Sequence, residues 1–264
     1  MLMTIEEICL VMQEAERKAG ELILHAKGVM TENKSGARDV VTQYDRAVQQ
    51  LVIWNLRAAL PEAHFFCEEM NEQESLDAAQ LFIIDPIDGT MNFVRGFSHS
   101  CVSVAYAENG VVQAAAVYNP YLDEMFHAVR GAGAFLNGSP IRTAGDDLGN
   151  SVVCFGTAPY NPELSDKTFA LARRMFDRSL DVRREGTAAL DLCSVAAGRA
   201  GLYFELSLSL WDYAAGALIV EEAGGLFRRA DGEALCFSAE KSSIVAAASE
   251  SVLEEYLRET EELR

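Results

Sequence analysis

The first sixty residues repeat apolar positions at helical intervals. Apolar residues three to four apart predict an amphipathic helix, and they stand at Ile5, Ile8, Met12, Ala15, Ala19, Leu22 and Ala26. Thr4 followed by Glu7 has the spacing of a capping box at the start of that helix. A second helix is predicted from about Asp45 to Leu60, where Pro61 ends it. The polar segment TENKSGARDVVTQYD, residues 31–45, predicts a mobile loop or a hairpin between them.

From residue 81 the pattern changes to that of strands. LFIID, residues 81–85, is a short apolar run typical of a buried strand. Residues 99–120 predict two strands joined at Asn109-Gly110, a pair typical of hairpin turns. Residues 124–141 continue in the same style, with a further Asn-Gly at 137–138. The first half therefore predicts helices packed on a largely antiparallel sheet.

In the second half, strand-like and helix-like segments alternate. Strands are predicted at 151–156, 181–185, 200–206 and 242–249, and helices at 162–176, 186–198 and 211–225, with a final acidic helix. Alternation of this kind predicts an α/β layer, so the fold class is mixed α/β. A boundary at 140–150 would divide the chain into an N-terminal α+β sub-domain, 1–145, and a C-terminal α/β sub-domain, 146–264.

The net charge, the hydropathy and the cysteines limit which partners and which compartment are expected. Lys and Arg total 22 against 40 Asp and Glu, a net charge of -18, which repels nucleic-acid phosphate and anionic membranes. No apolar run approaches the ~18 residues of a membrane span, and charges within the first apolar stretch argue against a signal peptide. The 6 cysteines include no CxxC pair, which favours reduced thiols in a cytoplasm. We therefore expect a cytoplasmic protein that binds neither nucleic acid nor membrane.

Two aspartates end the apolar run LFIID. Asp85 and Asp88 are separated only by Pro86 and Ile87, and oxygen ligands without Cys or His nearby favour Mg²⁺ or Mn²⁺ over zinc. Gly89 would let the backbone approach a ligand, and the amides after it could open a short helix that cradles an anion. Taken alone, however, such a motif is more often a turn at a strand end, which Pro86 would fix.

Three further segments carry polar groups of the same kind. Each has an ordinary structural explanation by itself; a carboxylate at a helix start, for example, caps the helix or pairs with its dipole. The residues are Glu68 and Glu69 after an apolar pair, Asp212 beside Trp211 at a predicted helix start, and Lys34, Thr42 and Asp45 in the polar loop.

Together these segments resemble the inositol monophosphatase family of metal-dependent, lithium-sensitive phosphatases. Its two diagnostic strings, D-P-[IL]-D-G-T-x-N-F and W-D-x-A-A-G, occur intact at 85–93 and 211–216. The resemblance continues through 186–205 and 221–225 and covers nearly the whole chain. It implies a layered α/β/α/β/α sandwich of the inositol monophosphatase and fructose-bisphosphatase type, usually a homodimer.

The resemblance also implies a metal site and a catalytic group. Two or three Mg²⁺ ions, with Mn²⁺ as a possible substitute and Li⁺ as an inhibitor, would be held by Glu68, Asp85, the carbonyl of Ile87, Asp88 and Asp212. Most of these ligands lie in the N-terminal sub-domain, and the C-terminal one completes the site. Thr90, supported by Asp45, would help Glu68 position and activate the attacking water.

The substrate contacts follow from the same resemblance. Phosphate would lie at the amides of Gly89 and Thr90, and the set of substrate-binding residues is Asp88, Gly89, Thr90, Gly186, Thr187, Ala188, Glu205 and Asp212. Lys34 would lie near the phosphate and the weakest metal. Arg183 could contact the substrate or pair with an acid. Cys67 stands where the family often has a glycine, which removes no ligand.

Charge supports metal dependence independently of the resemblance. Four carboxylates, at 68, 85, 88 and 212, and a phosphate monoester of charge about -2 would be balanced by three divalent ions, whereas two would leave roughly -2. Without metal the site should therefore repel its own substrate. We find no G-x-S-x-G or P-loop string, so direct attack by a metal-activated water is favoured over a Ser, Cys or His nucleophile.

The substrate is less closely defined. Family members act on inositol phosphates, fructose bisphosphate, histidinol phosphate or nucleoside 3′,5′-bisphosphates, and DGTMNF lacks the D-G-T-K-E-F string of the nucleotide branch. Glu205 could accept hydrogen bonds from two hydroxyls, which favours a small polyol or sugar phosphate, foremost inositol 1-phosphate. A non-catalytic alternative is a regulator or partner of the RNA machinery that keeps the fold. The intact ligand set argues against loss of catalysis but not against a second role.

Overall fold

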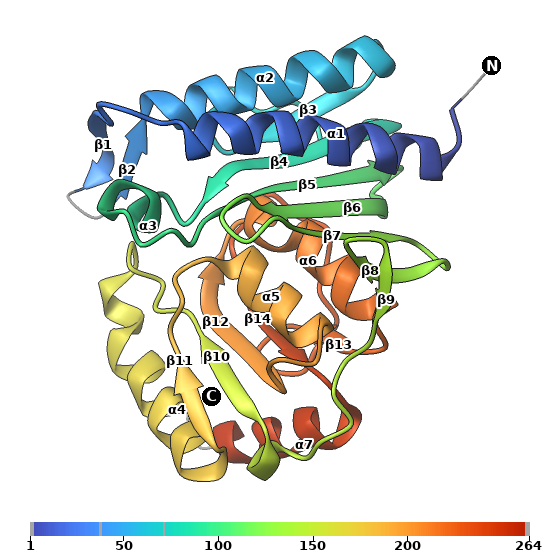
Figure 1. The fold of residues 1–264 in the computed structure, drawn as a ribbon. Coiled ribbons are helices and arrows are strands. Elements are labelled where there is room, and N and C mark those ends of the chain that lie inside the picture. Colours follow the sequence, from blue (N-terminus) through green and yellow to red (C-terminus); the bar gives the residue numbers. More distant parts are fainter. Residues whose placement is uncertain (1–2, 37–38, 71, 262–264) are drawn as a thin grey trace.

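Two β-sheets alternate with three layers of helices (Figure 1). The computed structural model describes residues 3–36, 39–70 and 72–261. Three hydrophobic clusters hold the layers together. One lies between the first helix layer and the first sheet, one surrounds the middle helices between the two sheets, and one lies between the second sheet and the last helix layer. The α/β/α/β/α sandwich implied by the family resemblance is confirmed.

The first sheet has seven strands, and its pairs are antiparallel except for β3 with β4. In spatial order they are β3 (His64–Cys67), β4 (Gln80–Asp88), β5 (Cys101–Glu108), β6 (Val111–Asn119), β7 (Glu124–Val129), β8 (Gly133–Leu136) and β9 (Ser139–Ile141). Both predicted Asn-Gly turns are present: φ is positive at Asn109 and Gly110 and again at Asn137 and Gly138. A two-residue hairpin of this type needs that conformation at both central positions.

Helices α1 (Ile5–Leu24) and α2 (Gln43–Ala59) cover the outer face of this sheet. Both begin with a capping box, Thr4 with Glu7 as predicted and Thr42 with Asp45, so α2 starts two residues before the predicted Asp45. Between them β1 (Thr31–Gly36) and β2 (Asp39–Thr42) form an antiparallel hairpin, one of the two predicted alternatives; residues 37–38 lie outside the described part. Leu22, predicted to join the buried stripe of α1, is 37% exposed at its edge.

The second sheet has five strands in the order β11-β10-β12-β14-β13. They are β10 (Val152–Phe155), β11 (Asp181–Arg183), β12 (Leu202–Leu208), β13 (Leu226–Arg228) and β14 (Ser242–Ala247). β10 is parallel to both β11 and β12, while β14 runs antiparallel to its two neighbours. The sequence analysis missed β13, because three residues after a glycine pair are too short to show a period.

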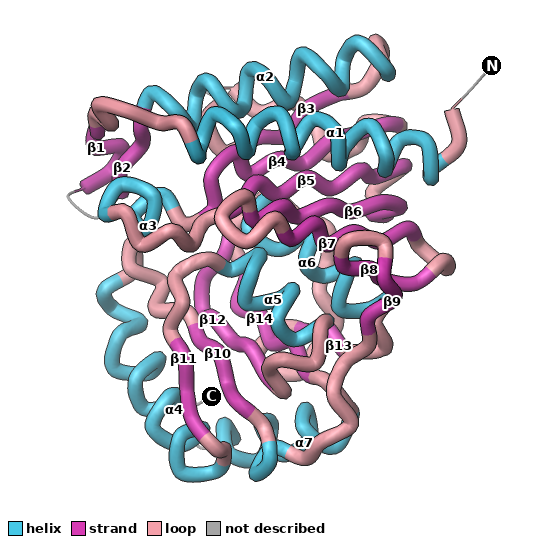
Figure 2. Tube along the Cα trace, in the orientation of Figure 1, coloured by secondary structure: helices cyan, strands magenta, loops and turns pink. Residues whose placement is uncertain are grey.

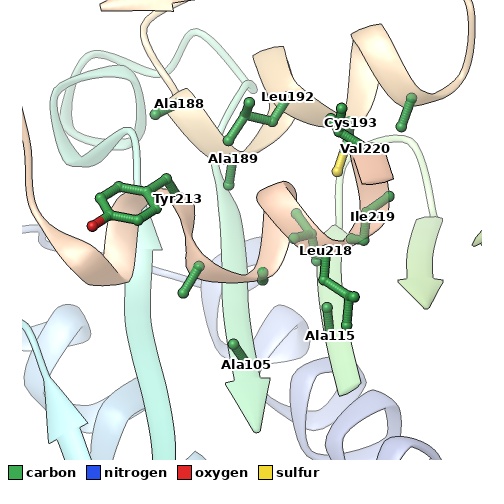
Figure 3. Packing of buried hydrophobic residues seen from close by; sticks show 14 of the residues in the cluster. Ala105, Ala115, Ala188, Ala189, Leu192, Cys193, Tyr213, Leu218, Ile219 and Val220 are labelled. Carbon is green, nitrogen blue, oxygen red and sulfur yellow. The ribbon is translucent and has the colours of Figure 1, made fainter. Parts of the chain in front are cut away.

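The middle layer consists of α5 (Ala188–Ala196) and α6 (Leu210–Glu222), which lie between the two sheets (Figure 2). α6 is apolar around most of its circumference, as expected of a helix buried on all sides. Small side chains allow this close packing: Figure 3 shows Ala105 and Ala115 of the first sheet facing the helix that carries Leu218 and Ile219.

The outer layer on the second sheet consists of α4 (Ser165–Arg178) and α7 (Glu250–Thr260). Three short elements complete the structure: α3 (Thr90–Arg95), η1 (Leu148–Asn150) and η2 (Pro162–Leu164). None of the helices within the described residues combines the length and the apolar character that a membrane span requires.

One acid breaks the apolar pattern of the first helix layer. Glu16 lies on the buried face of α1 with no exposed surface, and neither of its carboxylate oxygens has a hydrogen bond of good geometry. Burial raises the pKa of Glu16 well above its ordinary value, and the backbone of Val104 and the charge of Arg17 offset only part of that shift. The folded protein therefore holds a proton on Glu16 at pH values where the unfolded chain has released it.

We predict that Glu16→Gln removes a pH dependence of stability. Above about pH 4.3 the unfolded chain binds fewer protons than the folded one, so the free energy of unfolding of the wild type falls as pH rises. The neutral amide lacks this effect, so the variant should be more stable than wild type by about 1 kcal/mol or more near neutral pH. Urea denaturation across pH measures the difference. Glu14→Gln, on an exposed side chain of the same helix, is the control, and equal pH slopes in all three proteins would contradict the prediction.

Candidate active site

Strand β4 carries both aspartates of the sequence motif. It runs to Asp88 instead of ending at Asp85, so the predicted turn at Pro86 is wrong. Asp85 pairs with Ser103 and Asp88 with Cys101, which leaves one extra residue on β4. Such a bulge suits Pro86, which has no N–H to give to the ladder. Residues three apart on a regular strand face opposite sides, and the extra residue brings both carboxylates to the same side.

Asp88 connects the first sheet to the middle layer. Its Oδ2 accepts hydrogen bonds from the Thr187 hydroxyl at 2.6 Å and from the Ala189 amide at 2.7 Å. Thr187 is the N-cap of α5, so the carboxylate also lies at the positive end of that helix. Asn92 on α3 reinforces the junction, because its Nδ2 lies 2.8 Å from the carbonyl of Glu185. The motifs at 85–93 and 186–189, far apart in sequence, therefore meet at one place.

Gly89 fits a position where no other residue would. Its φ is +87°, in the left-handed region, and a Cβ there would lie 3.2 Å from the carbonyl oxygen of His99 and 3.3 Å from that of Gly186. The residue therefore allows β4 to turn directly into α3 against the α5 segment.

Asp212 on α6 lies near Asp85 and Asp88, and the region around these acids is here called the cleft. Asp212 is the third helical residue and forms a capping box with Ser209, whose amide lies 2.7 Å from Asp212 Oδ2. Burial raises the pKa of Asp212 well above its ordinary value, and the charges of Glu68 and Asp88 raise it further. The helix-cap role predicted from sequence is present, and it leaves the carboxylate within the electric field of the other acids.

The acids of this cleft repel one another. Burial raises the pKa of Asp85 well above its ordinary value, and the charges of Glu68, Asp88 and Asp212 add to the effect. Burial also raises the pKa of Asp88 to about 6, although its hydrogen bonds with Thr187 and Ala189 oppose the shift. Asp85 is 2% exposed, and its Oδ1 is buried without a hydrogen-bond partner. An all-oxygen donor set with an unsatisfied buried oxygen fits a hard divalent cation.

Lys34 supplies a positive charge at the edge of this cleft. Its Nζ lies 2.9 Å from Glu68 Oε1 and also pairs with Glu69. Burial alone would lower the pKa of Lys34, but the two glutamates outweigh it and raise the pKa. Across the described ranges no three acid, His or Cys side chains already surround a common point. Glu68 would therefore have to leave Lys34 to join the aspartates around a cation.

Thr90 contacts Asp45, the residue expected to support it, and also the carbonyl of Ile87. Its hydroxyl oxygen lies 3.2 Å from Asp45 Oδ1 and 3.0 Å from the carbonyl oxygen of Ile87. A hydroxyl has one proton and can donate to only one of the two. Asp45 is fully buried and is fixed by Thr42 at the start of α2. Donation to Asp45 would leave the oxygen of Thr90 free to accept a hydrogen bond.

Glu205 lies on β12 (Leu202–Leu208) in the second sheet. The carboxylate is 7% exposed, and its two oxygens accept hydrogen bonds from the Ala158 amide and the Tyr203 hydroxyl, each at 2.7 Å. Asp88 and Asp212 both lie within the field of its charge, so Glu205 belongs to the same cleft. Sequence reasoning missed Ala158 and Tyr203; the only signal was that Tyr203 stands two residues before Glu205, on the same face of the strand.

Arg183 has an acidic partner, one of the two alternatives left open for it. Its guanidinium pairs with Asp181 on the same strand, and a substrate contact by Arg183 stays a prediction. Gly186, Thr187 and Ala188 form the start of α5 beside Asp88, where the sequence analysis expected them. The roles assigned to these residues remain predictions.

Comparison with known proteins adds independent information. The sequence model of the inositol monophosphatase family matches residues 5–264. The Nus factor SuhB of Escherichia coli (strain K12) is 38% identical over 217 residues, which is 80% of this chain and 81% of that protein. The structure of an inositol monophosphatase from Anabaena (Nostoc) sp. PCC 7120 superposes with a TM-score of 0.85 at 31% identity, covering 97% of this chain and 96% of the other. An IMPase/NADP phosphatase complexed with Mg²⁺ and phosphate has a TM-score of 0.81 at 26% identity, covering 96% and 93%.

We predict that Gly89→Ala destabilises the protein more than Gly96→Ala. Both glycines flank α3 with positive φ, so each alanine costs about 1 kcal/mol or more in backbone strain. Only Gly89 faces two carbonyl oxygens, whereas a Cβ at Gly96 meets nothing within 4 Å. The close contacts should add at least about 1 kcal/mol. Urea denaturation measures both losses, and equal losses would contradict the close packing at Gly89.

Proposed function

The chain belongs to the inositol monophosphatase family, and we propose that it is a divalent-metal-dependent phosphatase of a small polyol phosphate. The best representative of that substrate class is inositol 1-phosphate. The observation that carries the proposal is a group of mutually repelling carboxylates from three separate segments of the chain. One of these carboxylates, Asp85, has a buried oxygen without a hydrogen-bond partner. Such a group is costly in a folded protein unless a cation compensates it.

Two or three Mg²⁺ ions would be held by Glu68, Asp85, Asp88, Asp212 and the carbonyl of Ile87. Bound ions would supply the positive charge that admits the phosphate, lowers the pKa of water and stabilises the charge of the transition state. The relative complexed with Mg²⁺ and phosphate supports this choice of metal. Mn²⁺ prefers similar oxygen ligands and should substitute.

The protein's own groups would position the attacking water and the phosphate. With Thr90 donating its proton to Asp45, the oxygen of Thr90 can accept a hydrogen bond from water. Glu68, once separated from Lys34, would accept the proton that the water loses as it attacks phosphorus. The first amides of α3, at Gly89 and Thr90, would donate to the phosphate oxygens. No covalent enzyme intermediate is required.

The alcohol would leave on the side of Glu205 and the start of α5. Each oxygen of Glu205 already accepts one hydrogen bond and can accept another from a substrate hydroxyl. Two such bonds match the neighbouring hydroxyls of a cyclitol or a sugar. The same site chemistry would also admit fructose 1,6-bisphosphate, histidinol phosphate or a nucleoside 3′,5′-bisphosphate as alternative substrates.

A second role is favoured by one comparison. The Escherichia coli relative at 38% identity is named a Nus factor, which supports a partnership with the RNA machinery as an additional or alternative function. Because such a role needs a surface and not the carboxylate cleft, a variant that has lost catalysis should retain it.

We predict that Asp88→Asn abolishes Mg²⁺-dependent phosphate release. The wild type should release phosphate from at least one member of a panel of polyol, sugar and nucleotide phosphates. The rate of release by the variant should be lower by at least about 100-fold. Removing a buried charge should leave the metal-free variant as stable as wild type or more so. Asp191→Asn is the control, because Asp191 is a buried aspartate on α5 within the field of Asp88 but outside the ligand set, so the change removes a neighbouring charge and no ligand.

Two results of this experiment would count against the proposal. Full activity in Asp88→Asn would refute the site, and no turnover on any ester by the wild type would favour the non-catalytic role.

We further predict that millimolar lithium inhibits the enzyme. Li⁺ is close to Mg²⁺ in size but has half its charge, so it can occupy an oxygen site while supplying less electrostatic stabilisation. Phosphate release should fall with added LiCl and not with the same concentration of KCl, and added Mg²⁺ should reduce the effect. Equal rates in the two salts would contradict the assignment of an inositol-type metal site.

A further inference from the structure

A short loop on the alcohol side of the cleft holds three charged side chains. Residues 156–160 follow β10 and are here called the 156–160 loop. Its Thr157 hydroxyl oxygen lies 3.2 Å from Arg184 Nη2, its Ala158 amide lies 2.7 Å from Glu205 Oε1, and its Tyr160 ring lies 5.6 Å from Lys241 Nζ. Within five residues, this loop therefore gathers two cations around the buried carboxylate expected to bind the alcohol.

The backbone of this loop leaves space for the carboxylate of Glu205. The Gly156 amide donates to the carbonyl of Phe204 at 3.0 Å, which ties the loop to β12. A Cβ on Gly156 would lie 1.8 Å from Glu205 Oε2, so the carboxylate occupies space that only glycine leaves open. Ala158 has a φ of +41° and is 2% exposed. An alanine held in the left-handed region stores strain, and strain of this kind concentrates at binding sites.

The two cations at this rim are available to a ligand. Arg184 and Lys241 are both exposed, and in the part of the chain that the structure describes neither has an acid within ion-pair distance. Their positive charges both act on Glu205. Glu205 is already compensated by hydrogen bonds with Tyr203 and Ala158, so the two cations exceed what that carboxylate requires.

Arg184 is also connected to the phosphate side of the cleft. Its Nη1 would lie 2.6 Å from a Cβ on Gly186, so the guanidinium packs against the backbone just before α5. The next carbonyl, that of Glu185, lies 2.8 Å from Asn92 Nδ2 on α3. One connected segment therefore links this rim to α3, at whose start the phosphate is expected.

We propose that Arg184 and Lys241 form an anion subsite for the leaving alcohol. The preferred substrate is then a polyol or sugar phosphate that carries a second phosphate, with hydroxyls that reach Glu205. This inference rests on the proposed phosphatase function and deepens it. Within the proposed class of small polyol and sugar phosphates it revises the choice of substrate: it places a bisphosphate such as fructose 1,6-bisphosphate ahead of inositol 1-phosphate, whose leaving alcohol is uncharged. Guanidinium and ammonium groups are the side chains that bind phosphate oxygens most strongly.

Two esters that differ only in the second phosphate test the proposal. Fructose 1,6-bisphosphate should be hydrolysed at its 1-position with a kcat/KM at least about tenfold above that of fructose 1-phosphate, which corresponds to one charge-assisted hydrogen bond. Lys241→Gln and Arg184→Gln should each lower kcat/KM for the bisphosphate by about tenfold, mainly through KM, and leave the monophosphate within about twofold. Lys18→Gln on α1, which makes the same change in net charge far from the cleft, is the control.

The outcomes separate this inference from the function on which it rests. Equal kcat/KM for the two esters, or equal losses on both esters in Lys241→Gln and Arg184→Gln, would overturn the anion subsite while leaving the phosphatase intact. A matching loss in Lys18→Gln would reduce the effect to net charge and overturn it as well. No Mg²⁺-dependent release from either ester or from the wider phosphate panel would refute the phosphatase itself.

Discussion

Repulsion between buried carboxylates is the constraint on which the rest of this structure depends. Asp85, Asp88 and Asp212 lie within one another's fields with Glu68 beside them, and burial removes most of the water that would screen them. Burial raises the pKa values of the three aspartates, and the charges of neighbouring acids raise them further. A fold that holds such a group is less stable than one without it, and the difference is recovered when cations bind.

The layers of the sandwich hold this group together from different directions. β4 brings two of the aspartates from the first sheet through a bulge, while α6 brings the third from the middle layer. The starts of α5 and α6 donate amides, from Ala189 and Ser209, that compensate part of the charge. Helix N-termini are suited to this because their first amides have no partner within the helix. Hydrophobic packing between the layers fixes the positions of the three aspartates, and the amides at the helix starts reduce the electrostatic cost of placing them together.

The two sides of the cleft have opposite electrostatic character, so each side would bind a different part of the substrate. On the side where metal is proposed to bind, acids outnumber the one lysine that the described residues bring to them, Lys34. On the alcohol side, Arg184 and Lys241 surround one acid that is already hydrogen-bonded. An ester oriented with one phosphate toward the acids and their cations, and the rest toward this rim, would meet complementary charge at both ends. Such a gradient orients a substrate before any close contact forms.

Periodicity, turn chemistry and motif spacing act over a few residues, so these patterns alone predicted most of the helices and strands, both Asn-Gly hairpins and the capping box at Thr4, and they led to the acids expected at the site. The short strand β13 left no such pattern. Packing between segments placed Pro86 in a bulge and paired Lys34 with Glu68 and Glu69. The same holds for the contact of Glu205 with Ala158, which comes from the loop after β10. Such contacts join residues as distant as Asp88 and Ala189, 101 positions apart. Their formation depends on how whole layers pack, and no local pattern of residues records that packing.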